Sequence, residues 1–418
     1  MSNRFDLRRL VFWIPLILPL YVVRFSIGPL PTTLLEVALL LALVAVTTKS
    51  GIAIWKKGFV RTKAWHIPAL LWIIATVVAV FVAPHHVAAL GLWRAYVVEP
   101  MLFALLLAGM IETDGDRQDV ELALISSMAW VVLYAIGQYL SGHGIPHPWN
   151  TSFLTRRATG PFPYPNALSL YCAPIAAYCI GKLLLKQEDT YPLMGRAPHA
   201  PTGDGHAPEG HMRERGRIVI LAVGFALGLL GILLAKSDGG FAGLLAATFV
   251  ALLWKKKTRN ATIAAIILGA GVILAVPKIR TPIIKAVTFQ EWSGHVRVLI
   301  WQESIAMLKD HPVFGAGLGA YPDVIKPYHK ATYIEIFQYP HDILLNLWSE
   351  TGLLGILAFA WLCVTWVRLA LKRDGDARHV AFLFPLIAIL VHGLVDVPYF
   401  KNDLAVVFWV FVILIPIA

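Results

Sequence analysis

The sequence predicts an all-α, polytopic membrane protein with about twelve transmembrane helices and a large helical loop outside the membrane. Its 418 residues are 58% hydrophobic and only 15% charged, and the mean hydropathy is +0.68. In a typical soluble domain, about a quarter of the residues are charged. The apolar residues form blocks that can cross a bilayer, for which a helix needs about 17–25 residues. This composition excludes an ordinary soluble globular protein.

Twelve apolar blocks are expected to form the transmembrane helices of a single integral membrane domain over 1–418. The first block lacks a small-residue cleavage site and is followed at once by another, so no cleavable signal peptide is expected. The twelve blocks are 10–27, 31–47, 67–83, 88–110, 118–140, 166–185, 218–236, 239–254, 261–276, 343–369, 379–397 and 401–418.

The distribution of Lys and Arg among the connecting segments predicts the orientation. If the N-terminus is cytoplasmic, the segments on that side hold more than half of the 36 Lys and Arg residues. Short basic loops remain in the cytoplasm, so both termini are expected there. The net charge of +11 then reflects contact with anionic membrane lipids, and no nucleic-acid partner is needed to explain it.

Three hydrophilic segments interrupt the apolar pattern, and the first of them, residues 141–165, is expected to face outward. Residues 186–217, rich in Pro, Gly and His, predict a flexible cytoplasmic loop. Residues 277–342 form the longest extracytoplasmic segment and are expected to carry catalytic elements. Within it, residues 291–312 have apolar residues near helical spacing, which predicts an amphipathic helix close to the outer membrane surface. The glycines of "VFGAGLGAYP" then predict a turn that leads to His341.

Ionisable residues inside predicted spans are functional candidates because charge is costly there. Arg94 and Glu99 share the span 88–110, either as a structural ion pair or as a substrate contact. His392 and Asp396 stand four residues apart near the outer end of another span, where they form either a proton relay or a buried hydrogen bond. No arrangement of Cys, His and acidic residues predicts a metal site.

The stretch "QYPHDILLNLWSETG" opens an apolar helix with polar residues. His341 is followed by one polar residue, Asp342, then by nine residues and by Gly352-Leu-Leu-Gly355. This pattern resembles the O-antigen ligase and polymerase family, whose members carry a His, a small polar residue, nine residues and Gly-x-x-Gly.

Three further stretches extend the resemblance over roughly residues 150–357. "RVLIWQESIAMLKDHPVFGAGLGAYP" is similar to the family's Arg-x-x-x-Trp helix and the D-H-P-x-x-G-x-G turn that follows it. "TRRATGPFPYPNALSLY" resembles its R-x-x-G-x-F-x-x-P-N entry to a middle span, and "LLAKSDGGFAGLLAA" its S-R-G segment. Two residues depart from the pattern. Asp238 replaces the family's arginine, with Lys236 nearby, and Asp342 stands where Asn, Ser or Gln is usual.

The resemblance implies a GT-C-like glycosyltransferase of the bacterial inner membrane with an extracytoplasmic active site. Such an enzyme moves a glycan from undecaprenyl pyrophosphate to an acceptor hydroxyl, for example of a lipid A-core glycolipid. The donor already carries a good leaving group, so neither a cofactor nor a metal is expected. Direct displacement by the acceptor would invert the anomeric carbon.

The residues suit this chemistry. His341 is the expected general base, because imidazole exchanges protons near neutral pH, and Asp342 or Glu350 is expected to orient it. Arginine matches phosphate oxygens with its planar fork. The residues expected to hold the pyrophosphate are Arg297, Arg156, Arg157, Arg280 and Lys236.

Other functions remain open at this point. Within the family, a polymerase or a protein O-oligosaccharyltransferase differs mainly in its acceptor. A transporter of a lipid-linked sugar or anion is the alternative from another class. It would predict broken spans related by internal symmetry, and the sequence has no such halves.

Overall fold

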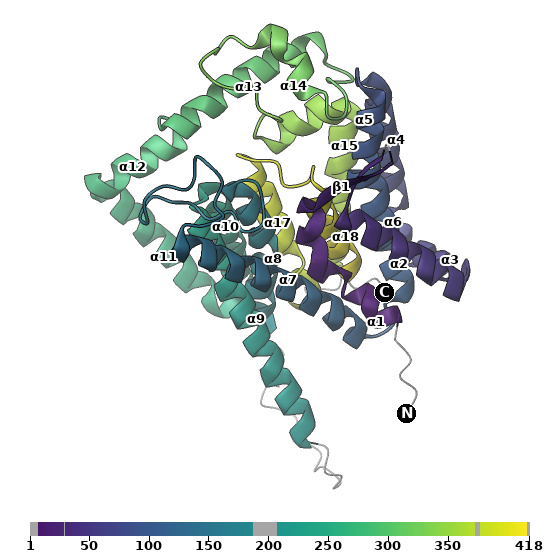
Figure 1. The fold of residues 1–418 in the computed structure, drawn as a ribbon. Coiled ribbons are helices and arrows are strands. Elements are labelled where there is room, and N and C mark those ends of the chain that lie inside the picture. The colour runs from purple at the N-terminus through teal and green to yellow at the C-terminus, as the bar shows by residue number, and fades with distance from the viewer. Residues whose placement is uncertain (1–6, 29, 187–206, 373–376, 416–418) are drawn as a thin grey trace.

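The computed structural model describes residues 7–28, 30–186, 207–372 and 377–415. Over these ranges the chain is all-α apart from one antiparallel hairpin of strands β1 (Arg24–Ile27) and β2 (Leu30–Thr33) (Figure 1). The predicted all-α class is therefore confirmed.

The described residues include fewer membrane-crossing helices than the predicted twelve. Seven helices are long and apolar enough, and the bent pair α2 (Leu34–Ser50) and α3 (Ala53–Arg61) adds an eighth if it forms one broken span. Three predicted spans correspond to shorter apolar helices, α10 (Asp238–Trp254), α17 (Leu383–Gly393) and α18 (Asn402–Leu414). The seven long helices are Lys63–Val82, His86–Met110, Asp114–Ser141, Pro165–Leu185, Arg215–Ala235, Lys256–Ala275 and Ile343–Leu371.

The first predicted span, 10–27, is not one helix. It is divided among α1 (Leu7–Phe12), the 3-10 helix η1 (Ile14–Val22) and β1. Pro15 and Pro19 lie inside this stretch. Each lacks a backbone N–H and clashes with the preceding turn of an α-helix, which disfavours a regular span. The apolar character predicted burial but not helix type.

The other elements complete the bundle. Their bounds are η2 (Lys63–Trp65), α4 (His66–Val82), α5 (His86–Trp93), the π-helix η3 (Arg94–Val98), α6 (Glu99–Met110), α7 (Asp114–Ser141), α8 (Pro165–Lys186), α9 (Ala207–Ala235), α11 (Lys256–Ala275), α12 (Pro277–Val287), α13 (Trp292–Asp310), α14 (Tyr321–Val324), the 3-10 helix η4 (Lys326–Tyr328), α15 (Ile343–Leu371) and α16 (Ala377–Val380).

Helix α8 packs against α9, α10 and α17, and most of its apolar stretch is buried. Small residues allow this close packing, as is common between membrane helices. A Cβ added to Gly228 of α9 would lie only 2.6 Å from the Cβ of Ala176 on α8. The predicted loop 186–217 lies largely outside the described residues, and its final part, from Ala207, belongs to α9.

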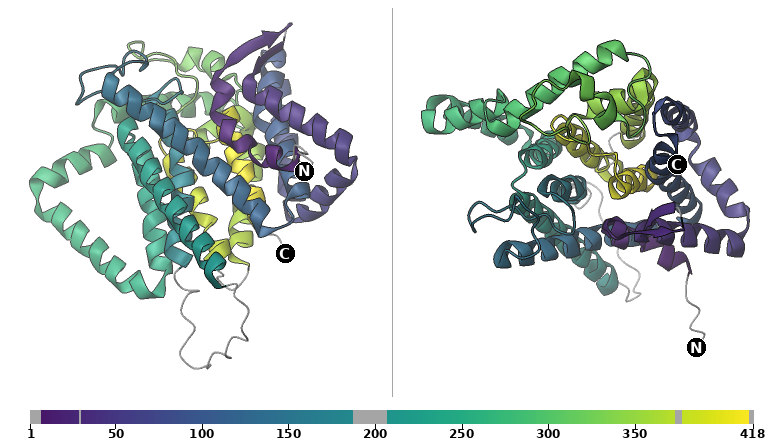
Figure 2. Two further views of the ribbon diagram at one scale, coloured as in Figure 1. Left: turned by 60° about the horizontal axis from the view of Figure 1, so that its bottom comes forward. Right: turned by 45° about the horizontal axis from the view of Figure 1, so that its top comes forward.

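Helices α11 and α12 form an arm that projects from the other helices (Figures 1 and 2). Only 6% of the apolar stretch of α11 is buried inside the protein, and α12 has no buried residue. A helix as apolar and as exposed as α11 is expected to face lipid chains. The arm connects directly to α13, which crosses above the bundle.

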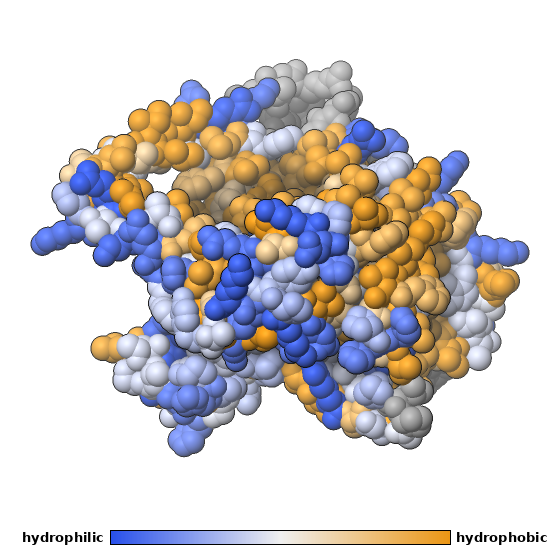
Figure 3. Space-filling view, turned by 90° about the horizontal axis from the view of Figure 1, so that it is seen from above, coloured by the Kyte–Doolittle hydropathy of each residue, from blue (hydrophilic) through white to orange (hydrophobic). Residues whose placement is uncertain are grey.

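The segment 277–342 covers one end of the bundle, and α1 lies toward the opposite end (Figure 1). The helix predicted in this segment is present as α13, with Ile300, Ser304, Met307 and Leu308 among its buried residues. Seen from above, the same end has a recess with a largely hydrophobic inner wall and hydrophilic residues along part of its rim (Figure 3).

A kink in α15 anchors this segment to the bundle. Gly352 has φ 67° and ψ −171°, and Leu353 donates its backbone N–H to the Val313 carbonyl at 3.0 Å. A Cβ on Gly352 would lie 2.3 Å from that carbonyl oxygen. The backbone N–H of Ala316 also donates to the Ser349 carbonyl, at 2.7 Å. The glycine turn 313–320 therefore packs directly against residues 349–353 of α15, the helix that begins just after His341.

Candidate active site

His341 lies where the outer segment enters α15, and its backbone is held from both sides. Its φ is 53°, a left-handed conformation that is uncommon outside glycine and that often marks a functional position. Before it, the indole N–H of Trp301 donates to the Pro340 carbonyl at 2.9 Å. After it, the side chain of Asp342 caps α15 by accepting from the Leu345 N–H at 2.8 Å.

Asp396 is the carboxylate that faces His341. Its Oδ1 lies 3.4 Å from His341 Nδ1, an ion-pair distance, and its side chain is 1% exposed while that of His341 is 19% exposed. The Val397 N–H donates to Oδ1 at 2.9 Å, and the Asn166 amide donates to Oδ2 at 2.9 Å. Asp396 is therefore fixed by donors on both oxygens, and imidazole stands beside it.

Asn166 joins this carboxylate to an arginine. Its Oδ1 accepts from the guanidinium of Arg157 at 2.9 Å, and the Nε of Arg157 donates to the Ala235 carbonyl at the end of α9, at 2.8 Å. Burial lowers the pKa of Arg157, and the nearby cation of Arg297 adds to this, while Asp238 and Asp396 act in the opposite direction. Even so, an arginine remains charged at neutral pH. A continuous chain of contacts thus runs from Arg157 to His341.

Arg297 approaches the same place from α13. Its Nε donates to the Val395 carbonyl at 3.1 Å, next to Asp396 in the chain. Arg297 and Trp301 stand four residues apart on α13, so one helix both supports the backbone before His341 and brings a guanidinium to the carboxylate segment. The structure thus brings together His341, Arg297, Arg157 and Asp396 from the predicted site.

Three predicted phosphate ligands have other contacts. The guanidinium of Arg156 donates to the Tyr139 carbonyl at 3.0 Å, and Lys236 donates to the Leu154 carbonyl. Arg280 lies on the exposed arm helix α12 and donates to the Leu274 carbonyl at 3.3 Å. These contacts hold the outer loops and the arm, and none of them involves His341.

The predicted orienting residues of His341 also have structural contacts. Asp342 caps α15, and the buried carboxylate of Glu350 accepts from the Gly319 N–H of the glycine turn. His392 is buried with no hydrogen-bond partner on Nδ1. Helix α17 ends at Gly393, so Asp396 does not share a helical face with His392 as the spacing predicted.

Arg94 and Glu99 form an ion pair, with 3.2 Å between Nε and Oε1. Arg94 also contacts the buried carboxylate of Glu36 at 2.7 Å, and the amide of Asn402 donates to the same carboxylate at 2.7 Å. This network connects α2, η3, α6 and α18, which favours the structural interpretation of the pair.

Two groups of functional candidates were not singled out from the sequence. Asn166 is the last residue of the quoted R-x-x-G-x-F-x-x-P-N motif, so a signal for it existed. Tyr339 packs its ring against His341 with 4.9 Å between centroids, and its hydroxyl bonds to that of Tyr164. The only sequence signal for these tyrosines was their nearness to His341 and Asn166 in the chain.

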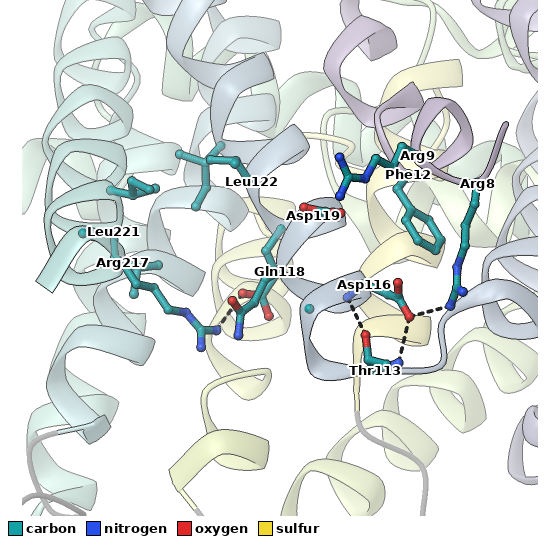
Figure 4. Close-up of a pocket in the computed structure, with 15 residues that line it drawn as sticks. Arg8, Arg9, Phe12, Thr113, Asp116, Gln118, Asp119, Leu122, Arg217 and Leu221 are labelled. Carbon is teal, nitrogen blue, oxygen red and sulfur yellow. Dashed lines mark hydrogen bonds and ion pairs between the residues drawn. The ribbon is translucent and has the colours of Figure 1, made fainter. Parts of the chain in front are cut away.

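A cavity of about 640 Å³ lies elsewhere, between α1, α7 and α9. Figure 4 shows Arg8 near Asp116 on one side of it and Arg217 on the other. Arg217 pairs with Glu121 at 2.9 Å. The lining of this cavity contains no histidine. The cavity belongs to segments predicted to be cytoplasmic, so it does not supply the chemistry found at His341.

Among the described residues, no group of three His, Cys or acidic side chains has the arrangement of a metal site.

The comparison with protein families covers the part of the chain that carries His341. Residues 223–360 match the family model for O-antigen ligase. The match includes Asp238, Arg297, His341 and Gly352, whereas Asp396 lies beyond it. No curated protein matches the chain. The resemblance predicted from the motifs is therefore confirmed for this part of the chain: residues 223–360 carry an O-antigen ligase domain.

Proposed function

We propose that this protein transfers a glycan from undecaprenyl pyrophosphate to the hydroxyl of a lipid A-core type acceptor, with His341 as the general base. The observation that carries the proposal is the 3.4 Å contact between His341 and the buried, doubly hydrogen-bonded carboxylate of Asp396. The reaction takes place at the outer face of a bacterial inner membrane, and both chain termini are cytoplasmic. The fold is GT-C-like.

The transfer is a single displacement. The acceptor oxygen forms a bond to the anomeric carbon while the bond from that carbon to the pyrophosphate oxygen breaks. The electron pair leaves with undecaprenyl pyrophosphate, and the configuration at the anomeric carbon is inverted. The hydroxyl proton passes to Nε2 of His341, because Nδ1 faces Asp396. The carboxylate then stabilises the imidazolium that forms.

The two arginines have the complementary task. Negative charge builds on the pyrophosphate as the bond breaks, and fixed cations stabilise it most effectively when they are already in place. Arg157 and Arg297 are held by the carbonyls of Ala235 and Val395. Each guanidinium has five N–H donors, and these contacts leave donors for phosphate oxygens. No metal is required for this step, so turnover in EDTA is expected to equal turnover without it.

The test is transfer by the purified protein in lipid nanodiscs. His341→Ala is expected to lower kcat by about 10²- to 10⁴-fold, the usual contribution of a general base. His143→Ala is the matched control, because His143 is an exposed histidine of the outer loop 141–165. Normal transfer by a correctly folded His341→Ala protein would remove His341 from the reaction. A panel of acceptors separates ligation to a glycolipid from chain polymerisation and from transfer to protein.

A further inference from the structure

Lys401 places a buried amino group at the start of α18, close to an aromatic ring. Its Nζ is shielded from solvent and has no hydrogen-bond partner among the residues that the structure describes. It lies 4.0 Å from the centroid of the Tyr164 ring. The backbone is fixed at the start of α18, where the Lys401 N–H donates to the Tyr399 carbonyl at 2.7 Å and the Lys401 carbonyl accepts from the Ala405 N–H at 2.9 Å. The position of the side chain is therefore set by the fold.

Aromatic rings connect Lys401 to the candidate active site. The hydroxyl of Tyr164 bonds to the hydroxyl of Tyr339. The Tyr339 ring in turn meets the imidazole of His341 edge to face, with 4.9 Å between centroids. Lys401 is therefore separated from His341 by two aromatic side chains.

The charges near Lys401 differ from those near the arginines. Asp403 attracts Lys401 and Arg24 repels it, and the ion pairs between described residues do not include one between Lys401 and Asp403. One carboxylate oxygen of Asp403 is itself buried without a partner. The charged neighbours of Arg157 are Asp238, Arg297 and Asp396. Lys401 contacts Tyr164 and the Tyr399 carbonyl, whereas the two arginines contact Asn166 and the carbonyls of Ala235 and Val395, so Lys401 lies outside the arginine contacts.

An unpaired, buried ammonium group is costly, and the contact with one aromatic ring offsets only part of that cost. We propose that Lys401 binds a phosphate group of a substrate, at a subsite separate from the pyrophosphate contacts of Arg297 and Arg157. This inference rests on the proposed transfer reaction. The phosphate belongs either to the lipid-linked donor or to a phosphorylated glycolipid acceptor, and the two sources have the same chemistry at Nζ.

Steady-state kinetics of the full chain in nanodiscs test this subsite. Lys401→Met keeps the length of the side chain and removes the charge, and Lys401→Arg keeps the charge. Lys309→Met is the matched control, because Lys309 is an exposed lysine of α13. Loss of one charged contact is expected to raise the KM of the phosphorylated substrate by about 10- to 100-fold, with little change in kcat. Lys401→Arg is expected to restore most of the affinity.

The substrates distinguish the two sources of phosphate. A raised KM for the lipid-linked donor alone assigns the subsite to the donor. A raised KM for a phosphorylated acceptor, but not for the same acceptor after phosphatase treatment, assigns it to the acceptor. Unchanged KM values for both substrates in Lys401→Met would overturn the inference, even if the variant unfolds at a lower temperature.

A binding measurement separates failure of this inference from failure of the proposed function. Inorganic phosphate is expected to raise the unfolding temperature of the wild-type protein, and this shift is expected to shrink in Lys401→Met but not in Lys309→Met. If the wild-type protein transfers no glycan yet shows this difference, the transfer reaction is refuted and the phosphate subsite stands. Equal shifts in all three proteins would refute the subsite.

Discussion

Replacing Asn166 by alanine tests whether the chain of contacts from Arg157 to His341 acts as a unit. The change removes the donor to Asp396 Oδ2 and the acceptor for the Arg157 guanidinium, both at 2.9 Å. A hydrogen bond to a charged group contributes about 1.5–3 kcal/mol. Since about 1.4 kcal/mol corresponds to a tenfold rate change, kcat/KM is expected to fall by about 10- to 150-fold. The fall is expected mainly in kcat, because Asn166 positions Asp396 and does not itself react.

Arg217→Ala is the matched control for this prediction. It removes a charge-assisted contact of 2.9 Å to the buried carboxylate of Glu121. Arg217 is on α9, the helix whose last residue, Ala235, accepts from Arg157. The two positions differ by 18 residues, so they lie about 27 Å apart at 1.5 Å per residue. The assay is transfer of labelled glycan in nanodiscs together with thermal unfolding. Equal activity losses in Asn166→Ala and Arg217→Ala, or unchanged kcat/KM in Asn166→Ala, would refute the reasoning.

Three further predictions concern one site residue and two structural features. Arg297→Lys is expected to lower kcat/KM by about tenfold or more, because lysine lacks the planar fork that matches phosphate; equal rates for it and for the exposed control Arg259→Lys would argue against a phosphate contact. Gly352→Ala is expected to lower the unfolding temperature strongly, since φ is 67° and the Cβ would lie 2.3 Å from the Val313 carbonyl oxygen, whereas Gly269→Ala, with open space around it, is expected to be neutral or slightly stabilising. Glu36→Gln removes the charge that pairs with Arg94 and is expected to cost about 1.5 kcal/mol, since Arg94 keeps its pair with Glu99; the cost is measured by thermal unfolding against the exposed control Glu291→Gln, and an unchanged unfolding temperature would show that the Glu36 network does not stabilise the bundle.

The sequence predicted the fold class well, whereas the twelve full spans are not confirmed, for a physical reason. A high mean hydropathy indicates that a segment avoids water. It does not indicate whether the segment faces lipid chains or the interior of the protein. The apolar stretch 401–418 was predicted to cross the membrane, yet the described helix α18 ends at Leu414 and is buried along its whole length. The stretch 10–27 is just as apolar, but its prolines interrupt the helix.

The candidate site was predictable where a motif carries the residue and unpredictable where the fold brings segments together. His341 and Arg297 belong to local patterns within residues 291–357 and were found from the resemblance of those patterns to the family's motifs. The partner of His341 was not, because Asp342 and Glu350 are its neighbours in the chain while Asp396 is 55 positions away. The packing of α15 against α17, together with the contact of Arg297 on α13 with the Val395 carbonyl, places that carboxylate beside the imidazole.

The replacement of the family arginine by Asp238 has a physical consequence at this site. Burial lowers the pKa of Arg157. Asp238 acts in the opposite direction and raises it, whereas Arg297 lowers it. An arginine at position 238 would therefore have added a third cation beside two that already repel each other. With aspartate there, Arg157 and Arg297 stand near the two carboxylates of Asp238 and Asp396, and the pyrophosphate of the proposed donor would compete with Asp238 for Arg157. A buried or partly buried cation that is already near a fixed carboxylate gains less binding free energy from a substrate anion than a cation without such a neighbour. Asp238→Asn is thus expected to lower the donor KM, and a higher donor KM in that variant would show that Asp238 assists donor binding.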